Sequence, residues 1–166
     1  MKDYELKLVR IEEKEVLRNL IEKYYYEFSQ YDNRDVNEFG MYGYNYLDNY
    51  WTEENRWPYF IKCNGNLAGF AMINSYTEKN YGKIDYNLSE FFIMHKYRRN
   101  GAGKYAANKL FKTYKGTWQV LINKKNTVSE KFWKKTIGEF TDENFKIINL
   151  SSYKEDRKVE LYILKT

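Results

Sequence analysis

The amino-acid sequence predicts an α/β or α+β fold built on a mixed sheet, and three features lead to this class. Alternating apolar residues near the N-terminus precede a segment with helical spacing, which gives the order strand, helix. Asn64-Gly65 separates two apolar runs, residues 58–63 and 67–74, and readily supplies the positive φ values of a tight type I′ turn between antiparallel strands. Residues 84–122 contain, in order, a strand pattern, a glycine-containing turn, a helical pattern and a strand pattern.

The first half of the chain supports the opening strand and helix. Residues 4–8 alternate apolar and charged side chains and predict a strand. Residues 12–29 carry apolar side chains at helical spacing and predict a long helix. A second helix is expected between Asp35 and Asn49, but Gly40 and Gly43 interrupt that segment, so half of it is also compatible with a loop.

The second half alternates strands and helices. The expected elements are a strand over 84–94, a helix over 102–114, a strand over 117–122, a helix over 127–138, and strands over 145–150 and 159–164. In the first of these helices Ala106, Ala107, Leu110 and Phe111 form the inner face. The glycine-containing turn therefore lies inside a β-turn-α-β unit.

Length and composition predict one domain, residues 1–166. A chain of 166 residues can build a full core, and neither a linker nor a repeat divides it. No apolar stretch approaches the roughly 20 residues of a membrane span and the N-terminus lacks a signal-peptide core, so we expect a cytoplasmic protein. The single cysteine, Cys63, excludes an internal disulfide, and with His95 as the single histidine the usual zinc ligands cannot be assembled.

The net charge of +5 is unevenly distributed along the chain. Residues 1–80 hold 10 basic and 14 acidic side chains, a net charge of −4, whereas residues 81–166 hold 18 and 9, a net charge of +9. A basic second half suits a polyphosphate cofactor, and an acidic first half suits a neutral or cationic second substrate. We expect no nucleic-acid partner, because the positive charge concentrates around one turn and no base-reading motif appears.

The turn within residues 88–104 predicts a phosphate-binding site. Gly101 and Gly103 allow the backbone to approach a ligand closely, and the N–H groups that open the next helix point toward the turn. The helix dipole adds roughly half a positive charge there, and Arg98, Arg99 and Lys104 add full charges. These features favour a pyrophosphate group over a carboxylate, although a solvated basic loop is the alternative.

Two other nucleotide-binding motifs were weighed against this turn. Residues 101–106 fit the Gly-x-Gly-x-x-Ala pattern of a dinucleotide-binding turn. However, a hairpin precedes the turn, and the following strand ends in Asn123-Lys124-Lys125 rather than in an acidic ribose ligand. The phosphate loop of triphosphate hydrolases requires Gly-x-x-x-x-Gly-Lys-Ser/Thr, which does not occur in the chain.

The segment Arg98-Arg99-Asn100-Gly101-Ala102-Gly103 resembles the Gln/Arg-x-x-Gly-x-Gly/Ala signature of the GNAT superfamily of N-acetyltransferases. A second family element, Asn-x-x-Ala-x-x-Phe-Tyr, corresponds to residues 126–133, with Ser129 in place of Ala and Trp133 in place of Tyr. Residues 88–146 resemble an uncharacterised bacterial subgroup of predicted acetyltransferases. The resemblance implies a mostly antiparallel sheet of about six to seven strands, flanked by helices and splayed at the coenzyme A site.

The resemblance also implies which residues bind acetyl-CoA as co-substrate. Backbone groups of Phe92, Ile93 and Met94 would pair with the pantetheine arm in the manner of a strand. After Arg98, which opens the signature, backbone amides of the next six residues would hold the pyrophosphate: Arg99, Asn100, Gly101, Ala102, Gly103 and Lys104. Asn126 would reach the pantetheine, and Phe132 and Trp133 would flank it.

Acetyl transfer to an amine requires a base, because an alkylammonium has a pKa near 10.4 and must lose a proton before its nitrogen attacks. Glu90 shares a strand face with Phe92 and Met94 and is predicted to be this base, directly or through water. A surface or salt-bridged glutamate is the alternative. The backbone N–H of Met94 is the expected oxyanion donor.

The general acid is less well defined, because the indole of Trp133 cannot deliver a proton at ordinary pH. Tyr97, Tyr162 or water would substitute for it, or no acid is used. His95 is interpreted as a solvated loop residue and Cys63 as a strand residue rather than a nucleophile.

The sequence therefore predicts an N-acetyltransferase that transfers an acetyl group from acetyl-CoA to a primary amine by direct attack in a ternary complex. The acceptor is a small-molecule or peptide amine, and aromatic residues within 39–51 together with Asp48 would form its pocket. The alternatives are a non-catalytic CoA-binding or regulatory protein and a dinucleotide-dependent enzyme. The oligomeric state stays open, with a homodimer among the options.

Overall fold

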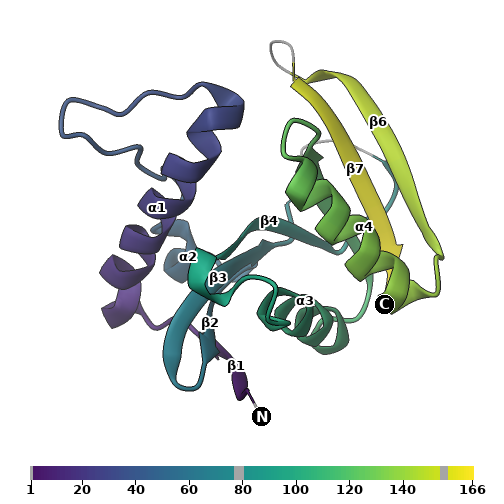
Figure 1. Cartoon of the computed structure of the whole chain (residues 1–166), viewed down its shortest axis with the longest axis horizontal. Helices are drawn as coiled ribbons and strands as arrows, with labels where there is room; N and C mark the ends of the chain where they lie inside the picture. Colours follow the sequence, from purple (N-terminus) through teal and green to yellow (C-terminus); the bar gives the residue numbers. More distant parts are fainter. Residues whose placement is uncertain (1, 77–80, 154–156) are drawn as a thin grey trace. The chain divides into compact units, whose positions relative to one another are not determined.

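The computed structural model describes residues 2–76, 81–153 and 157–166 (Figure 1). Its strands are β1 (Tyr4–Leu8), β2 (Arg56–Cys63), β3 (Asn66–Asn74), β4 (Tyr86–Ile93), β5 (Thr117–Asn123), β6 (Phe145–Tyr153) and β7 (Arg157–Lys165). Its α-helices are α1 (Lys14–Asp32), α2 (Asn49–Thr52), α3 (Ala102–Thr113) and α4 (Thr127–Thr141). Short 3-10 helices, η1 (Ile11–Glu13) and η2 (His95–Tyr97), precede α1 and follow β4.

The strands form one seven-stranded sheet in the order β1-β2-β3-β4-β5-β7-β6. β1 is antiparallel to β2, and β7 is antiparallel to both β5 and β6, whereas β4 and β5 run parallel. The parallel register joins Tyr86–Leu88 to Trp118–Val120, and β4 continues to Ile93 beyond it. The predicted fold class, a mixed and mostly antiparallel sheet with helices, is confirmed.

Contacts within the chain divide it into two compact units, Met1–Met72 with Glu90–Ala102 and Ile73–Ser89 with Gly103–Thr166. In the first unit α1 buries Leu17, Leu20, Ile21 and Tyr24 in a core with these residues of α2, the strands and the loops: Val9, Leu47, Tyr50, Phe60, Phe70, Met72 and Phe92. Spacing of three or four residues places the α1 side chains on one helix face. The prediction that 1–166 is one domain stays a prediction.

The second unit is centred on the indole of Trp118, which is fully buried. The rings of Phe111 and Tyr86 lie 5.1 Å from it, and Phe111 also contacts Phe140 of α4 at 5.3 Å. The predicted inner face of α3 is confirmed, because Ala106, Ala107, Leu110 and Phe111 are all buried. None of the helices in the described part of the chain is long and apolar enough to cross a membrane.

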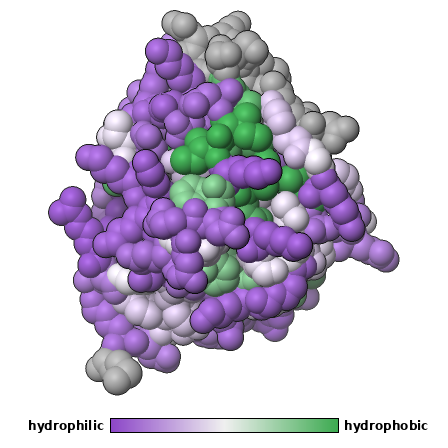
Figure 2. Space-filling view, turned by 90° about the vertical axis from the view of Figure 1, so that its right-hand side faces the viewer, coloured by the Kyte–Doolittle hydropathy of each residue, from purple (hydrophilic) through white to green (hydrophobic). Residues whose placement is uncertain are grey.

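A second apolar cluster in this unit belongs to β6 and β7 and consists of Leu150, Val159 and Leu161, with Tyr81, Ile148 and Ile163 packed against it. Figure 2 faces the side on which β6 and β7 are drawn in Figure 1 and shows hydrophobic surface among hydrophilic side chains. Partly exposed apolar side chains are common on soluble proteins, so this surface alone assigns no partner.

The predicted helix over 35–49 is wrong, because most of this segment is irregular and only Asn49–Thr52 is helical. Gly40 and Gly43 both have a φ of 70°, in the left-handed region, which stops a helix. The Glu22 carboxylate of α1 instead accepts hydrogen bonds from the backbone N–H groups of Tyr42 and Gly43 at 2.8 and 2.9 Å. The segment is therefore held as a loop against α1.

The hairpin of β2 and β3 follows the prediction closely. Asn64 and Gly65 have φ values of 50° and 75°, as a type I′ turn requires. Cys63 is buried in β2 and forms no disulfide, which agrees with its interpretation as a strand residue. The other predicted strands and helices are present, with ends that differ by up to three residues, and β4 runs from Tyr86 to Ile93 where 84–94 was predicted.

Gly69 of β3 allows β3 and β4 to approach closely. A β-carbon added at Gly69 would overlap the carbonyl oxygen of Phe92. The Met94 N–H donates a hydrogen bond to the Ala68 carbonyl at 2.9 Å, one residue away. Only glycine fits at this contact, which fixes the position of the end of β4.

We expect Gly69→Ala to lower the free energy of unfolding by about 3 kcal/mol, because the backbone of β4 must shift to admit the methyl group. Gly65→Ala is the matched control, since Gly65 has open space around it and only its positive φ is strained, at about 1 kcal/mol. Urea denaturation of both variants measures the difference. Equal losses would show that the β3–β4 contact tolerates a side chain.

Candidate active site and coenzyme turn

The turn between β4 and α3 has the backbone shape of an anion-binding loop. After η2, Arg98 is extended, whereas Arg99 and Gly101 have φ values of 57° and 90°. Left-handed residues that alternate with other conformations curl the chain so that successive N–H groups converge. Helix α3 begins at Ala102, so its first N–H groups and its dipole add to this site.

The side chain of Arg98 forms contacts within the protein as well as carrying a positive charge. Its guanidinium forms an ion pair with both carboxylate oxygens of Glu27 in α1, at 2.7 and 2.8 Å. Its Nε donates to the Ile93 carbonyl at 2.7 Å. The charge of Arg98 is therefore already neutralised by an acidic residue that the sequence analysis did not identify.

Of the other two predicted cations, Lys104 belongs to the second unit and Arg99 to the first. Lys104 Nζ lies 2.5 Å from Glu139 of α4, and this hydrogen bond holds the pKa of the Glu139 carboxyl below its usual value. Arg99 is exposed on the turn. The side-chain charge expected from the sequence is thus partly taken up by internal ion pairs.

Glu90 lies on β4 with its carboxyl group buried against tyrosine rings, although the residue keeps some exposed surface. Burial raises the pKa of Glu90 to about 7, and a hydrogen bond from the Tyr24 hydroxyl opposes the rise. Burial and the charge of Glu90 raise the pKa values of Tyr24, Tyr25 and Tyr44. The predicted base therefore occupies the environment that tunes a carboxyl toward neutrality.

The tyrosines around Glu90 form a connected group. The Tyr25 ring lies 6.3 Å from that of Tyr42 and 6.1 Å from that of Tyr44. The Arg34 guanidinium stacks 4.0 Å from the centre of the Tyr25 ring and pairs with Asp32. Asp48, predicted as an acidic acceptor residue, is instead 72% exposed and pairs with Lys14 at 2.9 Å, so it contributes nothing to this group.

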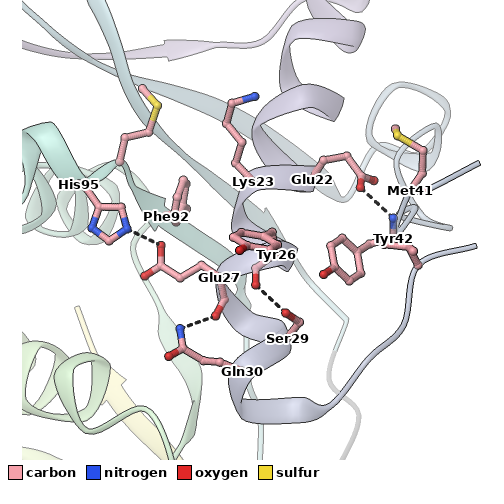
Figure 3. Close-up of a pocket in the computed structure, with 13 residues that line it drawn as sticks. Glu22, Lys23, Tyr26, Glu27, Ser29, Gln30, Met41, Tyr42, Phe92 and His95 are labelled. Carbon is pink, nitrogen blue, oxygen red and sulfur yellow. Dashed lines mark hydrogen bonds and ion pairs between the residues drawn. The ribbon is translucent and has the colours of Figure 1, made fainter.

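A cavity of about 1130 Å³ opens in the first unit between α1, the loop over 36–42 and the end of β4 (Figure 3). Its walls carry these residues: Glu22, Lys23, Tyr26, Glu27, Ser29, Gln30, Val36, Gly40, Met41, Tyr42, Phe92, Met94 and His95. Phe92 of β4 lies on the strand face that also carries Glu90, and Met94 follows the end of the strand. Rings, thioethers and carboxylates thus meet in one concave site, which is the usual character of a ligand pocket.

The predicted oxyanion donor is wrong. The Met94 N–H is engaged with the Ala68 carbonyl of β3, at 2.9 Å, and so points away from any ligand on the other edge of β4. Because N–H groups alternate along a strand, the Ile93 N–H faces the opposite edge. The solvated interpretation of His95 holds, because its side chain is 81% exposed, and its Nε2 lies 3.4 Å from Glu27.

In the second unit, Asn126 is the N-cap of α4, and its side-chain oxygen accepts a hydrogen bond from the Ser129 N–H at 3.0 Å. Trp133 is buried and packs edge-to-face on Phe132 with ring centres 4.9 Å apart. Each of these side chains therefore has a structural role, and their predicted contacts with pantetheine stay predictions.

Tyr162, an alternative general acid, is fully buried and donates to the Glu160 carboxylate at 3.2 Å. Lys124 pairs with the same carboxylate at 2.7 Å. Burial and the Glu160 charge raise the pKa of Tyr162, which makes it a weaker proton donor. Within residues 2–76, 81–153 and 157–166, no group of three or more His, Cys, Asp or Glu side chains has an arrangement that could hold a metal ion.

Comparison with known proteins agrees with this fold. The sequence profile of the acetyltransferase (GNAT) family matches residues 15–138, so the chain belongs to this family. It is accordingly an acyltransferase with acetyl-CoA as co-substrate, as the sequence predicts. A search of curated proteins found no match to this chain.

Solved structures share the fold at low sequence identity. The spermidine N-acetyltransferase from Vibrio cholerae, solved with CoA and spermine, is similar with a TM-score of 0.68 at 11% identity, over 98% of this chain and 95% of that chain. An acetyltransferase from Salmonella typhimurium that modifies the N-terminal serine of ribosomal protein L7/L12 gives 0.70 at 12%, with the same coverage. The aminoglycoside acetyltransferase AAC(6')-Ib, solved with coenzyme A, gives 0.69 at 11%, also over 98% and 95%.

The cap role of Asn126 predicts a stability effect. Asn126→Ala should lower the free energy of unfolding by about 1 kcal/mol, because the Ser129 N–H loses its partner, while Asn126→Asp should retain the cap. Urea denaturation measures both. If Asn126→Ala is as stable as the wild type, the side chain does not cap α4.

Proposed function

We propose that this enzyme transfers the acetyl group of acetyl-CoA to a primary amine by direct attack in a ternary complex, with Glu90 as general base. The observation that carries this proposal is the buried Glu90 carboxyl, whose pKa of about 7 suits it to accept a proton near neutral pH. An exposed glutamate would keep a pKa near 4.5 and a salt-bridged glutamate would have a lower pKa, so either would be a weaker base.

The proton balance follows from this assignment. The acceptor enters as an ammonium ion and gives one proton to the Glu90 carboxylate, which frees the nitrogen lone pair. The nitrogen then forms a bond to the acetyl carbon as the carbon–sulfur bond breaks, and the second proton of the nitrogen is lost to water. The Tyr24 hydroxyl stabilises the ionised Glu90 before the transfer.

For the coenzyme, we place the pyrophosphate on the backbone N–H groups of the turn, from Arg99 to Lys104. The left-handed conformations of Arg99 and Gly101 and the start of α3 at Ala102 support this placement. The pantetheine would pair with the edge of β4 over Phe92 and Ile93 and approach Asn126, Phe132 and Trp133, as the family resemblance implies. The Met94 backbone is left out of this pairing, because its N–H donates to the Ala68 carbonyl and its carbonyl accepts from the Tyr97 N–H.

For the acceptor, we propose a small-molecule or peptide amine in the cavity beside α1. The carboxylate of Glu22 and the rings of Tyr26 and Tyr42 in its walls suit a cationic group. Proteins of this fold are named for spermidine, an N-terminal serine and aminoglycosides, which are all molecules that carry amino groups, and this supports an amine acceptor. We further propose that the enzyme is a cytoplasmic bacterial protein without a nucleic-acid partner.

The pH dependence tests the base. Because Glu90 must be ionised to accept a proton, kcat/KM should rise with pH and level off above about pH 7. Tyr24→Phe removes a hydrogen bond that lowers this pKa, so the rise should move to higher pH. The assay is CoA release with the best acceptor from a panel of polyamines, aminoglycosides, amino acids and peptide N-termini. A profile that Tyr24→Phe leaves in place would point to a different titrating group.

Glu90→Gln separates catalysis from simple CoA binding. It should lower kcat at least about 100-fold, since general base catalysis contributes that much, while CoA affinity stays unchanged. Glu5→Gln, at an exposed position of β1, is the control and should behave like the wild type. If Glu90→Gln keeps full turnover, Glu90 is not the base. If neither the wild type nor Glu90→Gln releases CoA with any acceptor of the panel, the non-catalytic CoA-binding alternative is favoured.

A further inference from the structure

We propose that Glu27 and Tyr4 are positioning residues, which hold the turn over residues 98–101 in the shape that binds the diphosphate of acetyl-CoA. Neither residue lies in the family signature, and both come from the N-terminal part of the first unit. Each fixes a different end of the turn through side-chain contacts.

Glu27 fixes the start of the turn through Arg98. Both carboxylate oxygens contact the guanidinium, at 2.7 and 2.8 Å, which is the paired geometry that a planar guanidinium favours. The Arg98 side chain also donates from Nε to the Ile93 carbonyl at 2.7 Å, and its guanidinium lies over the Phe92 ring at 5.5 Å. Arg98 is thus held by α1 on one side and by the end of β4 on the other.

Tyr4 fixes the end of the turn. Its hydroxyl donates to the backbone carbonyl of Asn100, 96 residues away in the chain. The ring also borders Gly101, because a β-carbon added there would lie 3.6 Å from the Tyr4 oxygen. The carbonyl of Asn100 is therefore drawn toward β1, and the N–H groups that follow are free to face the other way.

These contacts matter because the turn is strained by itself. Arg99 has a φ of 57°, and a residue with a side chain is disfavoured there by about 1 kcal/mol or more. A turn left to itself would sample other shapes, and binding would have to select the curled one. Two distant side chains that fix both ends remove that loss before the coenzyme arrives.

Glu27 also determines how the turn presents positive charge. Paired with Glu27, Arg98 contributes little net charge, so the backbone N–H groups and the helix dipole of α3 do most of the binding. An unpaired Arg98 would be a mobile cation near a diphosphate. The alternative to our proposal therefore makes an opposite prediction, namely that loss of Glu27 tightens coenzyme binding.

The test is calorimetric titration of CoA into the purified full chain. We expect Glu27→Gln to weaken CoA binding about tenfold and Tyr4→Phe about threefold, because each loses one restraint on the turn. Tyr4→Phe keeps the ring, so it isolates the hydroxyl and serves if Glu27→Gln folds poorly. Glu15→Gln, in the exposed Glu15–Arg18 pair of the same helix, is the control and should leave the dissociation constant unchanged.

A second comparison excludes a purely structural role. Arg98→Lys keeps the charge but loses the paired contact, and Glu27→Gln combined with it should bind CoA no more weakly than Arg98→Lys alone. Unchanged or tighter CoA binding in both Glu27→Gln and Tyr4→Phe, with only the thermal midpoint lowered, would overturn the proposal. Because CoA binding does not require Glu90, this result is independent of the base assignment.

Discussion

Burial of one carboxyl group against tyrosine rings is the constraint on which the chemistry of the first unit depends. Raising the pKa of Glu90 from 4.5 to about 7 makes its ionised form roughly 3 kcal/mol less stable. The fold tolerates this cost because Tyr24 is buried too, and the Tyr24 hydroxyl needs a polar partner that Glu90 provides. Rings of Phe28, Phe70 and Phe92 within 5.7 Å hold Tyr24 in place, so core packing and base strength are set by the same contacts.

In the coenzyme turn, two of the predicted side-chain charges are neutralised within the protein. The basic second half of the sequence suggested direct ionic attraction, but Arg98 and Lys104 are each paired with a carboxylate. A binding site made of backbone N–H groups depends on the shape of the chain more than on the number of cations. Shape in turn depends on contacts from distant segments, which explains why the turn is bordered by residues of β1 and α1 such as Tyr4 and Glu27.

Local patterns predicted those parts of the structure that local forces determine. Asn64-Gly65 specified its turn because its conformational preference acts within four residues, and the strand, turn and helix around Gly101 followed for the same reason. The helix predicted over 35–49 was wrong because Gly40 and Gly43, which interrupt the segment, adopt positive φ and the chain forms a loop there. The Glu27–Arg98 pair spans 71 residues, and no local signal distinguishes Glu27 from the other acidic residues of α1.

The same distinction explains the site residues. Glu90 was identified by strand alternation, but its pKa depends on its burial, on the Tyr24 hydroxyl and on the charge of Arg34, which no spacing rule places beside it. The general acid that would protonate the leaving group also depends on its surroundings. Trp133 is buried against Phe132, and Tyr162 is held by Glu160, which raises the pKa of its hydroxyl. A thiolate with a pKa near 8.5 is already a good leaving group at neutral pH. Glu90, with its raised pKa, therefore serves the amine, and water is sufficient to protonate the leaving thiolate.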